Sequence, residues 1–84
     1  MKPSIGSLVT VLLSSPSNGA LEAPALISRV WAAHDPIEAP VGVNLHVFPD
    51  AGLSFIAASV MLHDTREQAE ATTQRPVAFW PERV

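Results

Sequence analysis

The chain has 84 residues and no cysteine, and it carries a formal net charge of −3 with only 15% of its residues charged. This length suffices for one small domain, expected to span residues 1–84, and the lack of cysteine excludes disulfides, thiolate metal sites and cysteine nucleophiles. Its five Lys and Arg residues are scattered, which excludes the dense basic face of a nucleic-acid binder, and no apolar run approaches the roughly 20 residues that cross a bilayer.

The first apolar segment, Leu8–Ser14, is expected to form a strand of the folded domain. Its apolar run is short and is interrupted by Thr10, and its β-branched residues favour an extended backbone. Ser15–Pro24 is rich in small polar residues, so we expect a loop there. The alternative is a secretory signal that is cleaved among the small residues near Ala20 and Ala23.

A second strand is predicted over Ala25–Ala32. Alternation along this strand places Ile27, Arg29 and Trp31 on the same face. His34–Pro40 contains two prolines, which interrupt strand pairing, so we expect a second loop there.

The segment Val41–Phe48 has the clearest strand pattern in the chain. Its valines and its leucine point to one face, while Asn44 and His46 point to the other. Pro49–Gly52 has the composition of a tight turn, and it leads to a fourth strand over Leu53–Leu62. The third and fourth strands are therefore expected to form a hairpin.

The periodicity changes in the segment 63–73, where a polar helix of about two turns is predicted. Asp64 is followed three residues later by Glu67, a spacing typical of a capping box at a helix start. Pro76 is expected to end the helix, and Val77–Trp80 then forms a short last strand.

The predicted fold class is all-β with one short helix. Five short strands with a helical turn before the last one match a small SH3-like barrel. The alternative is an OB-like barrel, which usually carries its helix between the third and fourth strands. Closing a barrel removes sheet edges that a small domain would otherwise leave uncovered.

The two tryptophans lie at the ends of predicted strands, and Arg29 shares a strand face with Trp31. Aromatic rings and a guanidinium at a barrel mouth can bind a flat or anionic ligand, anchor a subunit interface, or fill the core. The candidate ligand or interface residues are Arg29, Trp31, Asn44, His46, Trp80 and Arg83.

Catalytic and metal sites have weaker support. The spacing of His34, His46 and His63 matches no common zinc-ligand pattern. Ser59, His63 and Asp64 include the residue types of a hydrolase triad, but the sequence has no nucleophile elbow around the serine. We expect no enzyme activity, no metal and no cofactor, and a small hydrolase is kept as a lesser alternative.

Self-association is also expected. The first strand carries Val9 on one face and Leu8 on the other, and the fourth carries Phe55 and Ile56 in the same way. A small barrel has one interior, so strands that are apolar on both sides indicate a second buried surface. A homo-oligomer, most simply a symmetric dimer, would cover it.

Five blocks of the sequence together resemble small accessory proteins of tailed bacteriophages. These blocks are KPSIGSLV at the start, ALISRVW, VNLHVF, SVMLHD, and FWPERV at the end. The family usually ends on tryptophan-x-tryptophan-proline-glutamate. Here Phe79 precedes Trp80, and one tryptophan of that closing pair is absent.

The resemblance bears on origin and implies no particular activity. Together with the weak support for catalytic and metal sites, it leads us to expect a non-enzymatic phage protein that acts by binding in the host cytoplasm. Its partner would be a host defence factor or a small nucleotide signal, with no role for nucleic acid or membrane. The alternative is a structural or capsid decoration protein of the virion.

Overall fold

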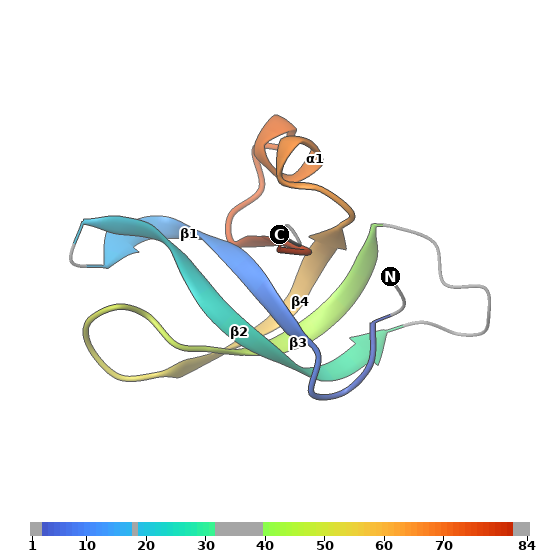
Figure 1. Cartoon of the computed structure of the whole chain (residues 1–84), viewed down its shortest axis with the longest axis horizontal. Helices are drawn as coiled ribbons and strands as arrows, with labels where there is room; N and C mark the ends of the chain where they lie inside the picture. Colours follow the sequence, from blue (N-terminus) through green and yellow to red (C-terminus); the bar gives the residue numbers. More distant parts are fainter. Residues whose placement is uncertain (1–2, 18, 32–39, 82–84) are drawn as a thin grey trace.

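The computed structural model describes residues 3–17, 19–31 and 40–81. These residues form five strands and one helix, in the order β1 (Leu8–Ser17), β2 (Ala20–Trp31), β3 (Val41–Val47), β4 (Phe55–His63), α1 (Arg66–Ala71) and β5 (Val77–Phe79). The strands close into a barrel in the order β1-β2-β3-β4-β5 (Figure 1). The predicted all-β small barrel is confirmed, and its helix lies before the last strand as expected for the SH3-like order.

The barrel core follows the alternation predicted for β3. Val43, Leu45 and Val47 are fully buried, whereas Asn44 and His46 lie on the outer face. The described residues contain no buried polar or charged side chain, so the interior is a packed apolar core. Chemistry that needs polar groups must therefore take place on the outer surface.

The prediction of a loop over Ser15–Pro24 is wrong. β1 continues to Ser17 and β2 begins at Ala20, so the two strands form a long hairpin that projects on the left of Figure 1. Gly19, with φ of +83°, takes the left-handed conformation at the turn. These small polar residues favour turns, but here they pair as strands. The register of the pairing shifts between Leu12 and Ser17.

The prediction that Ile27, Arg29 and Trp31 share one face of the strand is also wrong. The β2–β3 register shifts between Ile27 and Arg29, because an extra residue is inserted at this point. Ile27 is buried, while Arg29 and Trp31 lie on the exposed side. This irregularity moves both polar-tipped side chains to the outer face.

A second irregularity interrupts β4, where the register with β3 shifts opposite Asn44. Ser59 takes a φ of +56°, which is unusual for a residue with a side chain. As a result, Val60 and Leu62 are buried, whereas Ile56, which regular alternation would place on their face, is exposed. The β3–β4 connection covers 48–54 and is longer than the predicted turn.

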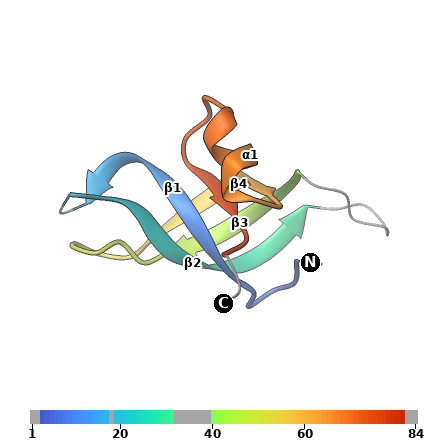
Figure 2. The ribbon, with the colours of Figure 1, turned by 45° about the horizontal axis from the view of Figure 1, so that its top comes forward.

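The predicted short helix is confirmed, and α1 begins one residue later than a cap at Asp64 implies. Thr65 is its N-cap, since its Oγ1 accepts a hydrogen bond from the Gln68 N–H at 3.2 Å. Ala69 packs with Leu12, Val77 and Phe79 in a small second cluster. Figure 2 shows α1 beside β4 and β5, so this part of the outer surface is covered by the chain itself.

The last strand, β5, closes the barrel over a short stretch only. It pairs antiparallel with Thr10–Leu12 of β1 and parallel with Leu62 and His63 of β4. The described residues contain no helix that is long and apolar enough to cross a membrane. Most of the loop predicted over His34–Pro40, and the candidate residue Arg83, lie outside the described residues.

Candidate functional site

Three of the six candidate residues lie together on the outer face of β2 and β3. In the β2–β3 register, Arg29 is opposite Asn44 and Trp31 is opposite Gly42. We call the outer surface formed by Arg29, Trp31, Gly42, Asn44 and Ser59 the Trp31 face.

Trp31 is held in one orientation although 49% of its surface is exposed. Its indole Nε1 donates a hydrogen bond to Asn44 Oδ1 at 2.7 Å. The guanidinium carbon of Arg29 lies 3.8 Å from the centroid of the Trp31 ring, which is a close cation–π contact. A ring that is fixed before binding loses little conformational entropy when a partner covers it.

Asn44 connects three strands through one oxygen atom. Its Oδ1 accepts from the Trp31 indole and also from the backbone N–H of Ser59, at 2.9 Å. The left-handed conformation of Ser59 accompanies this second bond, so the irregularity in β4 is part of the site. Sequence reasoning missed Ser59 in this role because a serine gives no signal of a positive φ.

Gly42 was also missed, although a glycine within a strand often marks a close approach. A Cβ atom added at Gly42 would lie 3.6 Å from the Cβ of Trp31 and 4.0 Å from the Met61 sulfur. The Trp31 and Met61 side chains therefore flank a position that carries no side chain, one from β2 and the other from β4. Met61 extends the apolar part of the Trp31 face onto β4.

His46 lies farther along β3 on the same outer surface, with different contacts. Its ring stacks on Phe48, with centroids 4.9 Å apart and planes at 4°. Its Nε2 lies 2.9 Å from the Ser54 hydroxyl oxygen. His46 thus ties the start of the β3–β4 connection to its end.

Trp80 is separated from the Trp31 face. It is half-buried and packs against the main core cluster, and its backbone N–H donates to the carbonyl oxygen of His63 at 3.3 Å. It also lines a pocket of about 260 Å³ with Asp64–Glu67 and Pro81. The two tryptophans do not form one site, because Trp80 lies on the core side and Trp31 lies outside.

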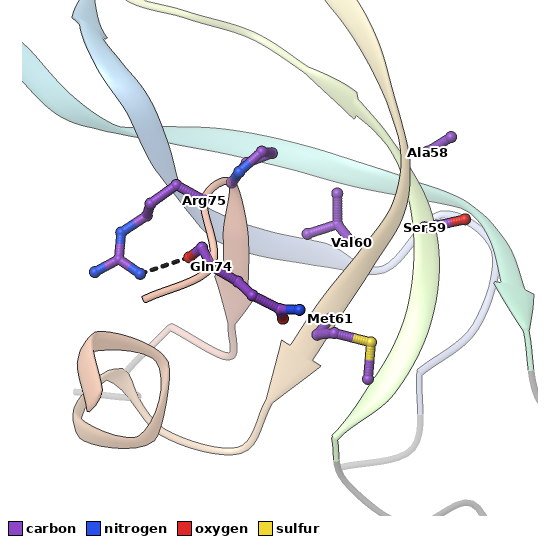
Figure 3. A pocket seen from close by; sticks show the side chains of 7 residues that line it. Ala58, Ser59, Val60, Met61, Gln74 and Arg75 are labelled. Carbon is purple, nitrogen blue, oxygen red and sulfur yellow. Dashed lines mark hydrogen bonds between the residues drawn. The ribbon is translucent and has the colours of Figure 1, made fainter. Parts of the chain in front are cut away.

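A larger pocket of about 380 Å³ adjoins the Trp31 face through Ser59 and Met61. Figure 3 shows Gln74 reaching toward Met61, while the Arg75 guanidinium points away. Arg75 donates to the carbonyl oxygens of Thr72 and Gln74, at 2.8 and 2.6 Å. The polar side chains around this pocket do not converge on one point.

The residues considered for hydrolysis do not form a nucleophile–base pair. Ser59 and His63 are four residues apart on one strand, which corresponds to about 13 Å, far beyond hydrogen-bond reach. The Asp64 N–H donates to Gln68 Oε1 at 3.2 Å, so this residue belongs to the helix start. Within residues 3–17, 19–31 and 40–81, no three His, Asp or Glu side chains lie close enough to hold a metal ion.

Comparisons of the chain with protein-family models, with curated proteins and with solved structures return no match.

Proposed function

We propose that this chain is a non-enzymatic binding protein that holds a protein partner on the Trp31 face. The observation that carries the proposal is the half-exposed indole of Trp31, fixed by Asn44 on one edge and stacked with Arg29. Tryptophan and arginine are the residues most enriched among the energetic hot spots of protein interfaces. A rigid, exposed pair of this kind is suited to recognition.

The partner is expected to present a carboxylate beside an apolar side chain. The guanidinium carbon of Arg29 lies 3.8 Å from the ring centroid, and a guanidinium that contacts a ring through its flat face keeps its in-plane N–H groups available to a carboxylate. Among the described residues, no acidic side chain forms an ion pair with Arg29. The Trp31 ring and Met61 supply the apolar contact next to it.

A protein partner is favoured over a small nucleotide by the same stack. A nucleotide base would bind by lying flat on the indole, but the Arg29 guanidinium already lies on the ring at 3.8 Å. On the face of the ring that Arg29 occupies, a base could stack only if Arg29 left this position. A protein segment can instead cover the outer side of the guanidinium and the free edge of the ring.

The proposed setting is a phage-infected bacterium, with a host defence protein as the partner in the host cytoplasm. Its support is the resemblance of the five sequence blocks to small phage proteins. The alternative, a structural protein of the virion, is distinguished by mass spectrometry of purified virions. High copy number in virions would favour that alternative, and absence from them would favour the cytoplasmic setting.

Selection from a displayed library of random peptides tests the recognition chemistry. We expect the enriched peptides to share an acidic residue beside an apolar one. Arg29→Ala and Trp31→Ala should each weaken binding at least tenfold, which corresponds to about 1.4 kcal/mol. Arg75→Ala is the matched control, because it removes an exposed guanidinium that is bound to backbone carbonyls elsewhere.

Two results would contradict the proposal. One is a selection that enriches no peptide, and the other is enriched peptides that bind Trp31→Ala as well as the unchanged protein. Circular dichroism of each variant confirms that a loss of binding reflects the lost side chain and not a loss of fold.

A further inference from the structure

We propose that two copies of this chain pair through the free edge of β4, antiparallel about a two-fold axis centred on Ile56. This inference rests on the pairing of the strands and is independent of what the Trp31 face binds.

The free edge lies on the side of β4 that faces away from β3. β4 pairs with β3 from Phe55 to Leu62, but on its other side it pairs with β5 only at Leu62 and His63. Alternate residues of a strand direct their N–H and C=O groups to opposite sides. Among the described residues, no strand accepts the groups that Phe55–Met61 directs away from β3.

There is room beside this edge for another strand. The pocket of about 380 Å³ lies along it, between Ala58–Met61 and Gln74–Pro76 (Figure 3). Farther toward Phe55, the β1–β2 hairpin and the β3–β4 connection diverge on the left of Figure 1. In the first half of β4, Phe55 and Ile56 are exposed.

The edge lacks the features that usually prevent strand pairing. The segment Leu53–Leu62 contains no charged residue and no proline, although monomeric proteins commonly place lysine or proline on an exposed edge. Apolar side chains are exposed beside it, with Leu53 at 90%, Phe55 at 42% and Ile56 at 63%. An edge left in this state is expected to be covered in the functional assembly.

A second copy is the occupant that the uncharged composition of this edge favours. The chain has a net charge of −3, so two copies repel each other through most orientations. Antiparallel pairing of β4 with itself opposes two uncharged segments and avoids this repulsion. A strongly charged partner strand would gain nothing from this edge, since it offers no opposite charge.

The alternation of β4 limits the possible registers. Phe55 and Ala57 point inward, and Ser54, Ile56 and Ala58 point outward, up to the irregularity at Ser59. A two-fold axis through Ile56 pairs inward residues with inward ones and outward with outward, and it avoids the irregular part of the strand. The two Ile56 side chains then meet on the outer face, and the two sheets continue as one.

The lack of native cysteine allows a direct cross-linking test. Directly paired residues of antiparallel strands have Cα atoms about 4.5–5.5 Å apart, within the range that a disulfide spans. Ile56→Cys should therefore form a covalent dimer under mild oxidation. Leu26→Cys is the matched control, because Leu26 is an exposed apolar residue on the same face away from the edge, and it should not cross-link.

Light scattering after size-exclusion chromatography tests the same interface without cysteine. The unchanged full chain should elute with twice its mass of 8.9 kDa at micromolar concentration. Ile56→Lys should halve the mass, since it places two like charges across the axis, whereas Leu26→Lys should not. A monomeric unchanged chain, a dimer that survives Ile56→Lys, or equal cross-linking of both cysteine variants would overturn the proposal.

Discussion

At the residue scale, Asn44 is the side chain that organises the Trp31 face. One carboxamide oxygen accepts from the Trp31 indole on β2 and from the Ser59 backbone on β4. Both donors lie on the exposed side of the barrel, so water can replace part of what is lost when the oxygen is removed. The unfavourable positive φ of Ser59, in contrast, is offset among the described contacts only by the hydrogen bond from its N–H to Asn44.

We expect Asn44→Ala to lower the free energy of unfolding by about 1–2 kcal/mol, the net value of two exposed hydrogen bonds. Asn44→Asp should lose much less, because a carboxylate oxygen can accept from both donors and lies opposite Arg29. Urea unfolding of the two variants beside the unchanged protein makes the measurement. Equal losses for alanine and aspartate would show that the oxygen has no such role.

At the element scale, the helix α1 is attached to the barrel by Arg66. The two terminal guanidinium nitrogens of Arg66 donate to the two carboxylate oxygens of Glu22 on β2, and Nη2 lies 3.0 Å from Oε2. The guanidinium carbon also lies 4.7 Å from the Phe79 ring centroid. One side chain thus joins the β1–β2 hairpin, the helix and β5.

The pKa of the Glu22 carboxyl is lowered, first of all by the hydrogen bond from Arg66. Partial burial acts in the opposite direction, and the positive charge of Arg66 adds a smaller lowering. Because the folded pKa lies below that of the unfolded chain, the pair stabilises the fold at neutral pH. This contribution is lost as the pH falls from the ordinary carboxyl value of 4.5 through the lower folded value.

Glu22→Gln should therefore lower the stability at pH 7 by less than about 1 kcal/mol, since both side chains are about 40% exposed. The difference from the unchanged protein should shrink as the pH falls below the ordinary carboxyl range. Denaturant unfolding between pH 7 and the acid side of the ordinary carboxyl pKa measures this difference in unfolding free energy. Glu70→Gln, on the helix surface, is the control for one lost negative charge. A difference that stays constant with pH would argue against the ion pair.

The elements that the sequence predicts well are those whose side chains alternate without interruption. β3 follows its pattern of valines and leucine residue by residue, and the helix is found to within a residue at its start. The long β1–β2 hairpin and the irregularities near Ile27 and Ser59 were not predictable, because pairing with neighbouring strands decides them. The same irregularities bring Arg29, Trp31 and Asn44 together.

At the scale of the whole molecule, the barrel depends on a strand of three residues. β5 is the strand that joins β1 to β4, and Phe79 is 2% exposed within the cluster beneath α1. A domain of 84 residues is expected to be stable by only about 4–13 kcal/mol. Truncating one buried phenylalanine costs about 3–5 kcal/mol, which is a large part of that total.

Phe79→Ala should therefore unfold the protein at a much lower temperature, and in one transition, since β1, β4 and α1 all lose a contact at once. Phe48→Ala is the matched control: it removes the same side chain from a site that is 41% exposed, where it stacks on His46 outside the barrel. Thermal unfolding at equal protein concentration compares the two. A similar melting temperature for both variants would mean that the Phe79 side chain does not hold β5 and α1 against the barrel.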